Sequence, residues 1–356
     1  MTNSGRTREN LLIGIRVLDG GMASELEYLG ADINGPLWSA HVLEDAPEKI
    51  TAVHRAYIEA GADIIETASY QVSRMGYAEV GLDPARADAA LLRSVALARQ
   101  AAAAFPDRRV LIAASLGPYG AALHNGAEYH GNYNCTFTDL IEFHRQRIRV
   151  FAEGSRTSAV LKGSDFTPHI QKAVPKGTGF SPYIQTRKST RALAPEGSFP
   201  GIIEAGEPVP DLLAFETLPS LAESEAIGQA LAPHPELAAW FSFTCRDERH
   251  VAHGELLRQC ATAVAAFPQT VAIGVNCTHP TLIPALIAEI RDATDKPIIV
   301  YPNSGEPWDA QNRCWTGTSD PSAYGISAAE WLAAGAQIIG GCCRTRPAHI
   351  REIAKL

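Results

Sequence analysis

Eight short apolar runs, most of them separated by segments with helical patterning, constrain the fold of this chain more than any other feature. Each run is continuous rather than alternating, and each ends in polar or glycine-rich residues. Continuous apolar runs are typical of parallel strands buried on both faces, and strands that alternate with helices indicate βαβ units. The runs lie at residues 16–21, 63–69, 110–117, 212–218, 238–244, 272–277, 297–303 and 338–343.

Segments with apolar residues at helical spacing fill most of the gaps between these runs. They lie at residues 47–60, 84–104, 137–152, 221–231, 254–267, 280–293 and 327–334. Eight βα units in one chain predict an α/β fold of the (β/α)8 barrel type, which typically takes about 250 residues. A doubly wound open sheet is the structural alternative, because periodicity does not show whether a sheet closes.

One long segment, residues 155–209, does not share the pattern of the rest. It lacks sustained periodicity, and its seven Lys and Arg against four Asp and Glu give it a charge of +3. A loop of this length is uncommon inside a compact domain. We interpret it as a flexible insertion between the third helix and the fourth strand of a single barrel domain, residues 11–356. Translated intervening sequence is the alternative origin. The polar residues 1–10 are predicted to form a disordered tail.

The charge and hydropathy of the chain disfavour several classes of partner. The formal net charge is −8, which does not suggest nucleic acid or an anionic membrane. No run approaches the roughly 18–20 apolar residues that a membrane span needs, and the polar N-terminus lacks the apolar core of a signal peptide. We therefore expect a cytoplasmic protein with small-molecule partners; the sequence does not indicate its oligomeric state.

Three of the seven cysteines fall at the ends of predicted strands. Cys342 and Cys343 follow two glycines that would give the backbone freedom to turn, and Cys277 ends the sixth run. In a barrel these ends share one rim, so three thiolates could form an open zinc site. Packing and a redox pair are the alternatives. The other cysteines, at positions 135, 245, 260 and 314, are interpreted as packing residues.

Carboxylates occupy equivalent places in three other runs. Asp19 ends the first run, Glu66 the second and Glu216 the fourth. Asp19 and Glu216 could bind the ammonium group of an amino acid on this rim. For all three carboxylates, the alternative role is a hydrogen bond to a neighbouring loop amide or a salt bridge between strands. A thiol bound to zinc would lose its proton and act as a nucleophile toward an alkyl group. A zinc hydrolase is a further hypothesis, for which His279 is the one plausible histidine ligand.

These residues together resemble the homocysteine S-methyltransferase family. The resemblance runs through the motifs at residues 18–21 (LDGG), 66–67 (ET), 214–217 (AFET), 274–277 (GVNC) and 340–343 (GGCC), and covers nearly all of the chain outside residues 155–209 and the N-terminal few. It implies a catalytic zinc ion, one per chain, held by Cys277, Cys342 and Cys343. It also implies that Asp19 and Glu216 hold the amino-acid part of homocysteine, with Glu66 and Asn276 as further substrate-binding residues.

The branches of this family differ in their methyl donor, which is betaine, methyltetrahydrofolate with cobalamin, or S-methylmethionine. The motifs at residues 115–120 (SLGPYG), 126–129 (GAEY) and 131–133 (GNY) look like the S-methylmethionine branch. Tyr119 and Tyr129, with Tyr133, could face a sulfonium cation through their rings, or could pack the loop. The resemblance thus implies a methyltransferase that forms methionine from homocysteine and S-methylmethionine, with S-adenosylmethionine or betaine as alternative donors.

Overall fold

Seven parallel strands form one continuous sheet. The computed structural model describes residues 11–157 and 209–356, apart from residues 15, 34–36, 38, 307, 310–313, 317 and 318. In sheet order, which is also chain order, the strands are β1 (Ile64–Glu66), β2 (Leu111–Leu116), β3 (Leu212–Leu218), β4 (Ala239–Phe243), β5 (Thr270–Asn276), β6 (Ile298–Tyr301) and β9 (Ile338–Ile339). Six of the seven lie within predicted runs, and β5 begins two residues before its predicted run, 272–277.

The remaining predicted run closes the sheet into a barrel. Val17 pairs in parallel with Ile339 of β9, and Leu18 pairs in parallel with Ile64 of β1. The first run therefore joins the two edges of the seven-stranded sheet. The result is the predicted eight-stranded parallel barrel, and the open-sheet alternative is wrong.

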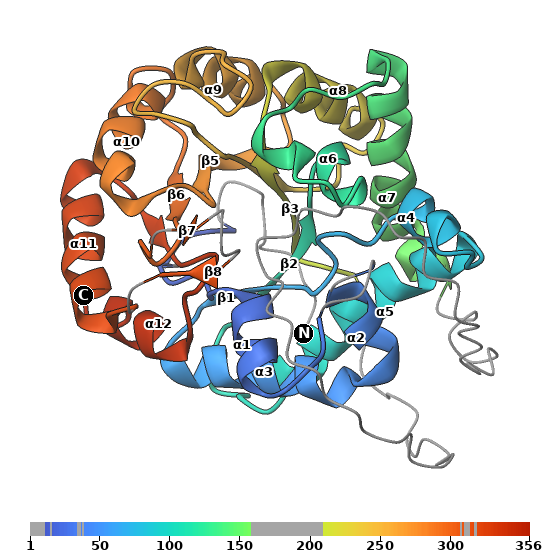
Figure 1. The fold of residues 1–356 in the computed structure, drawn as a ribbon, viewed down its shortest axis with the longest axis horizontal. Helices are drawn as coiled ribbons and strands as arrows, with labels where there is room; N and C mark the ends of the chain where they lie inside the picture. The colour runs from blue at the N-terminus through green and yellow to red at the C-terminus, as the bar shows by residue number, and fades with distance from the viewer. Residues whose placement is uncertain are drawn as a thin grey trace.

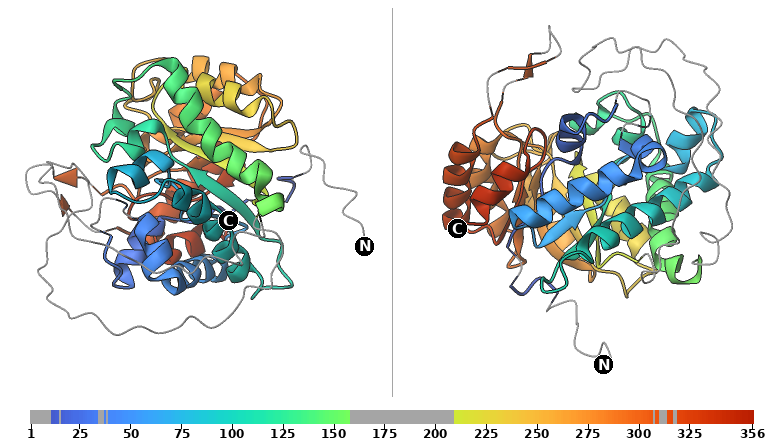
Figure 2. Two further views of the ribbon diagram at one scale, coloured as in Figure 1. Left: turned by 90° about the vertical axis from the view of Figure 1, so that its right-hand side faces the viewer. Right: turned by 90° about the horizontal axis from the view of Figure 1, so that it is seen from below.

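Helices form a ring around the strands, as Figure 1 shows from one end of the barrel and Figure 2 from two sides. The ring and its connections contain α1 (Met22–Tyr28), α2 (Ser39–Asp45), α3 (Pro47–Ala60), α4 (Arg74–Glu79), α5 (Ala85–Ala102), α6 (Tyr119–Ala122), α7 (Phe137–Thr157), α8 (Leu221–Leu231), α9 (Leu257–Ala265), α10 (Ile283–Arg291), α11 (Pro321–Ala334) and α12 (Pro347–Ile353). Two short 3-10 helices, η2 (Ala127–Tyr129) and η3 (Pro280–Leu282), and the hairpin of β7 (Trp308–Asp309) and β8 (Cys314–Trp315) lie in the loops.

The alternation of side chains along each strand produces two apolar layers. In β2, Leu111 and Ala113 face the barrel interior, whereas Ile112 and Ala114 face the helices. Two large aromatic residues help to fill the interior, and the Trp240 indole N–H donates to the Tyr301 hydroxyl at 3.1 Å. Both faces of each strand are therefore buried, which is why the runs are apolar without interruption.

The structure changes some predicted boundaries and adds helices. α11 starts six residues before the predicted 327–334, because Asp320 accepts from the Ser322 backbone N–H and Pro321 fits the first helical position. α7 continues to Thr157, so the first residues of the predicted insertion are helical. The rest of that segment, residues 158–208, and the predicted tail 1–10 lie outside the described residues.

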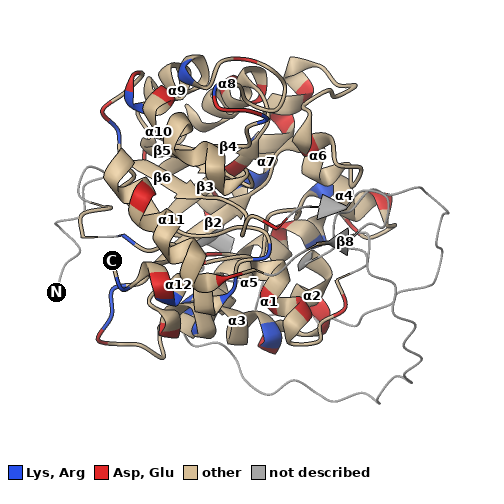
Figure 3. Cartoon of the chain, turned by 60° about the vertical axis from the view of Figure 1, so that its left-hand side comes forward, with Lys and Arg blue, Asp and Glu red and all other residues tan. Residues whose placement is uncertain are grey.

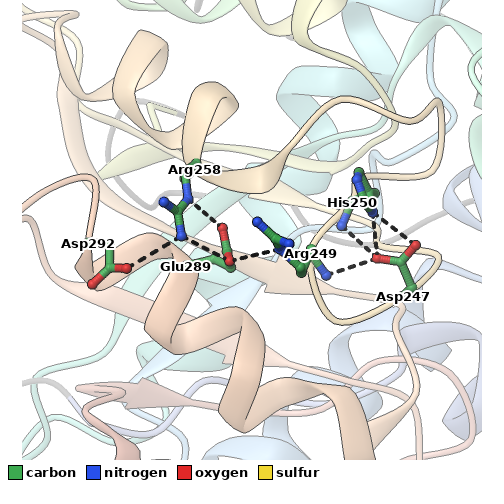
Figure 4. A network of polar contacts seen from close by, with 6 residues as sticks. All are labelled: Asp247, Arg249, His250, Arg258, Glu289 and Asp292. Carbon is green, nitrogen blue, oxygen red and sulfur yellow. Dashed lines mark hydrogen bonds and ion pairs between the residues drawn. The ribbon is translucent and has the colours of Figure 1, made fainter.

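Charged residues of both signs are interspersed over the outer helices in the view of Figure 3. Figure 4 shows one ion-pair network at the surface, in which Arg258 of α9 pairs with Glu289 of α10 at 2.7 Å. The network also contains Asp247, Arg249, His250 and Asp292. It ties the loop after β4 to α9 and α10. In the part of the chain that the structure describes, no helix is both long and apolar enough to cross a membrane.

Candidate functional site

Three sulfur atoms form a triangle at the C-terminal rim of the barrel. The Cys277 and Cys343 Sγ atoms are 3.8 Å apart, and the Cys342 and Cys343 Sγ atoms are 3.9 Å apart. All three lie within 4.8 Å of one another. Cys277 directly follows β5, and the other two follow β9. The structure thus brings together the three cysteines singled out in the sequence.

The backbone reaches this arrangement through residues with positive φ. Cys277 itself has φ 47°, and Arg344 has φ 67° in a turn that the Thr345 N–H closes onto the Cys342 carbonyl at 3.2 Å. Gly340 and Gly341 have no such φ, so the expectation that they supply conformational freedom is wrong. They are needed for space: a Cβ on Gly340 would lie 2.7 Å from the Asp19 carbonyl oxygen, and one on Gly341 would collide with Thr345.

The triangle has dimensions that suit a tetrahedral metal. Zinc–sulfur bonds of about 2.3 Å at tetrahedral angles separate two sulfur ligands by about 3.8 Å. Three thiolates leave a fourth position open, and soft sulfur ligands favour zinc. Within the described ranges, no other group of three His, Cys, Asp or Glu residues is close enough to hold a metal ion. His279, the ligand that a hydrolase would need, is exposed and caps η3 through its contact with Thr281.

Each of these thiols makes its neighbours harder to ionise when no metal is bound. The neighbouring Cys277 and Cys343 raise the pKa of the Cys342 thiol well above its usual value, and burial raises it further. A bound cation would reverse this preference by stabilising the thiolates.

Three carboxyl groups lie on the same rim: Asp19 and Glu216 are buried, and Glu66 is half-buried. Asp19 follows the first strand, Glu66 ends β1, and Glu216 lies near the end of β3. The Asp19 Oδ2 accepts from the Glu66 backbone N–H at 2.9 Å, and Ser115 donates to the Glu216 Oε1. The Asp19 Oδ1 and the Glu66 Oε1 are buried, and no donor from the described residues reaches them.

These carboxyl groups are difficult to ionise together unless a cation lies among them. Burial raises the pKa of Asp19 and of Glu66 well above the usual range, and the charge of Glu216 adds to both shifts. Burial raises the pKa of Glu216 to about 7, against the opposing hydrogen bond from Ser115, and the charge of Cys343 adds to it. The carboxyls and the thiols therefore belong to one site. A ligand with an ammonium group would stabilise the ionised carboxylates.

A bulge in β3 positions Glu216. The pairing of β3 with β4 shifts register between Phe215 and Leu218, and Thr217 has φ 59°, a strained value for a β-branched residue. Asn276 fixes the bulge, because its Oδ1 accepts from the Thr217 N–H at 2.7 Å and its Nδ2 donates to the Thr217 Oγ1 at 2.8 Å. The Asn276 amide is 3.5 Å from the Glu216 Oε2. Asn276 therefore orients the carboxylate of Glu216.

The loop after β2 brings Tyr129 to the site and directs Tyr119 elsewhere. The Tyr129 side chain is 40% exposed, and burial of its hydroxyl, then the charges of Cys277 and Cys343, raise its pKa well above the usual value. The Tyr119 ring instead packs against Tyr133 and Phe143, with centroid distances of 5.4 and 5.2 Å. Of the tyrosines quoted from this loop, Tyr129 is the one beside the thiols.

Two further residues at this site were not selected from the sequence. Tyr70 is half-buried, and burial of its hydroxyl, then the charges of Glu128 and Cys277, raise its pKa well above the usual value. Glu128 precedes Tyr129 in η2 and is 9% exposed. Glu128 stands in a motif that the sequence did display, but nothing in a polar loop indicates that its carboxyl is buried.

A family model and individual relatives agree on the family to which this chain is similar. The family model described as homocysteine S-methyltransferase matches residues 16–163 and 196–356. The homocysteine S-methyltransferase YbgG of Bacillus subtilis (strain 168) is 40% identical over 95% of this chain and 93% of its own length. The homocysteine S-methyltransferase of Escherichia coli (strain K12) is 37% identical over 95% and 94%, respectively.

Solved structures agree with the sequence comparisons. The oxidized and the metallated forms of the homocysteine methyltransferase MmuM from Escherichia coli each superpose with a TM-score of 0.74 at 34% identity, over 98% of this chain and 99% of theirs. The family match includes all three cysteines and all three carboxyl residues of the rim. The chain therefore belongs to the homocysteine S-methyltransferase family of enzymes.

Proposed function

We propose that this enzyme transfers a methyl group from S-methylmethionine to the sulfur of homocysteine, at one zinc ion held by Cys277, Cys342 and Cys343. The observation that carries the proposal is the position of a sulfur triangle beside three carboxyls, two of which have buried oxygens without a partner among the described residues. The charge of Cys343 acts directly on Glu216, so one ligand could span both groups. Homocysteine has the thiol and the ammonium group that these two groups would bind.

The residues of the chain would orient the acceptor. The homocysteine ammonium would donate to the free Asp19 Oδ1 and to Glu216, which Ser115 and Asn276 hold in place. Glu66 would add a third negative charge nearby. When bound to the cysteines, zinc would lower the pKa of the homocysteine thiol, so that a thiolate is the nucleophile at neutral pH.

The donor would enter from the side of Tyr129. An aromatic ring stabilises a nearby cation, and Tyr129 lies beside the cysteines where a methyl group would have to arrive. The transfer forms a carbon–sulfur bond on the acceptor and breaks one in the donor, so a thiolate and a sulfonium become two thioethers. Both products are methionine.

A donor panel with zinc quantified in the same preparation tests the proposal. Methionine formation from homocysteine is measured with S-methylmethionine, S-adenosylmethionine and betaine, and S-methylmethionine is expected to give the highest kcat/KM. Cys342→Ser should lose both zinc and activity. Cys260→Ser, at a buried cysteine of α9, is the control and should keep both. Full turnover in Cys342→Ser, or a preference for betaine, would contradict the mechanism or the donor, respectively.

A further inference from the structure

Glu128 is a buried carboxyl whose role the mechanism above leaves open. It is 9% exposed, and its Oε2 is buried without a hydrogen-bond partner among the described residues. Glu128 forms no ion pair with a described Lys, Arg or His side chain at 4 Å or less. A buried carboxylate without a cation is unfavourable, and such groups are retained where a ligand supplies the missing charge.

The fold holds this residue against the site. η2 packs on β3, the strand that carries Glu216. α6 approaches η2 so closely that a Cβ on Gly120 would lie 2.5 Å from the Glu128 backbone nitrogen. The unpaired oxygen is therefore fixed by the packing of two short helices.

Glu128 and the acceptor carboxyls come from different elements: Glu128 lies in η2, whereas the other three lie at strand ends. The charge of Glu216 adds to the raised pKa of Asp19 and of Glu66, and Asp19 adds to that of Glu66. The charge of Glu128 acts on Tyr70 and Tyr129 instead, and burial followed by the charge of Cys343 raises its own pKa to about 7. The rim thus has a second anionic point, on η2 rather than at the end of a strand.

Resting on the proposed function, we propose that Glu128 binds the α-ammonium group of the methyl donor. The reaction joins two amino acids, and the second anionic point is where the second ammonium group would be bound. The sulfonium is the less suitable target, because its positive charge disappears during transfer. An anion held against the sulfonium would stabilise the donor more than the transition state, whereas an anion at the ammonium stabilises both alike.

The test compares two ligands on three proteins by calorimetric titration of the zinc-loaded enzyme without homocysteine, so that no turnover occurs. The ligands are S-methylmethionine and its analogue with hydrogen in place of the amino group, 4-(dimethylsulfonio)butanoate. The proteins are the wild type, Glu128→Gln, and Glu225→Gln as a control at an exposed carboxylate of α8. Thermal melts verify that the variants fold.

Glu128→Gln should weaken S-methylmethionine binding by about 10- to 100-fold, the range of one charged hydrogen bond, and leave the analogue unchanged. Glu225→Gln should match the wild type for both ligands. An equal loss for both ligands, or no loss for either, would overturn the assignment of Glu128. A wild type that binds neither ligand would instead overturn the donor in the proposed function, and the assignment of Glu128 with it.

Discussion

Replacing Glu223 by alanine should destabilise the barrel and loosen the loop that carries Glu128 and Tyr129. Glu223 lies in the first turn of α8 and is fully buried. Its carboxylate accepts from the Tyr119 backbone N–H at 2.5 Å, the Tyr133 hydroxyl at 2.9 Å and the His144 Nε2 at 2.9 Å. Two of these donors belong to the loop after β2, so one side chain anchors that loop to two helices.

The contacts give the size of the effect. Burial lowers the pKa of His144 to about 4, so its ring is neutral at pH 7 and links Glu223 to Arg147, whose Nη2 is 2.9 Å from the His144 Nδ1. Glu223→Ala leaves three donors without an acceptor and removes the counter-charge of the buried Arg147. Each orphaned donor costs about 1–3 kcal/mol, and an unpaired buried charge about 3–5 kcal/mol. Because the side chains around the site can relax in part, we expect Glu223→Ala to lower the free energy of unfolding by about 3–5 kcal/mol. A typical domain has a free energy of unfolding of about 5–15 kcal/mol.

Urea unfolding followed by circular dichroism measures this loss. Glu225→Ala, on the exposed face of the same helix, is the matched control and should stay within about 0.5 kcal/mol of the wild type. Glu223→Gln keeps the shape of the side chain and one acceptor oxygen, so its free energy of unfolding should lie between those of Glu223→Ala and Glu225→Ala. If Glu223→Ala unfolds at the same urea concentration as Glu225→Ala, the network does not stabilise the fold and our account of the loop is wrong.

Three further changes test other parts of the structure. Asp19→Asn should raise the KM for homocysteine at least about tenfold with little effect on the KM for the donor, because the proposed function makes Asp19 a charged partner of the acceptor ammonium. Steady-state kinetics with each substrate varied measure both constants, and an equal rise in both would refute this role. Burial lowers the pKa of His54 to about 3 from 6.5, so unfolding takes up a proton between these values and stability falls as the pH drops below 6.5. Between pH 6.5 and 4.5, the free energy of unfolding of His54→Leu should fall by about 2–3 kcal/mol less than that of the wild type, as measured by urea unfolding. An equal fall in both proteins would contradict this. Gly274→Ala should abolish soluble expression, because a Cβ there would collide with the Ile299 carbonyl of the neighbouring strand, and a soluble variant with wild-type zinc content would show that β5 and β6 can separate.

The strands of the barrel were predictable because a strand buried on both faces is encoded by a continuous apolar run. Strands such as β2 and β3 have only buried residues, so their runs are apolar from end to end. Closure was not predictable in the same way. In the described part of the chain, bridge pairs at Val17 and Leu18 join the edges of the sheet, and no periodicity shows which strands these residues contact. The short α1, α2, α4 and α12 were missed because six or seven residues are too few to establish a helical period.

The site was predictable where its residues lie at strand ends, and less so where loops supply them. The end of a parallel strand defines its rim, so Cys277 and Asp19 could be placed together from the order of the runs. Glu128 and Tyr70 depend on how loops pack, and local sequence does not encode their burial. The tyrosines of the loop after β2 could not be ranked either, because Tyr119 and Tyr129 differ in the direction that α6 and η2 give them.

The position of Val17 and Leu18 between β1 and β9 has a consequence for synthesis of the protein. The Arg344 backbone N–H, just after the cysteine pair, donates to the Ser24 hydroxyl, just after the first strand, at 2.9 Å across 320 positions of sequence. A ribosome adds about 5–20 residues per second, so β9 is synthesised about 15–60 s after the first strand, with which it pairs. During that time one edge of the first strand is unpaired, and Asp19 lacks the cysteine pair that will lie beside it. The nascent chain therefore acquires its last strand, its closed barrel and its complete set of thiols at the same moment.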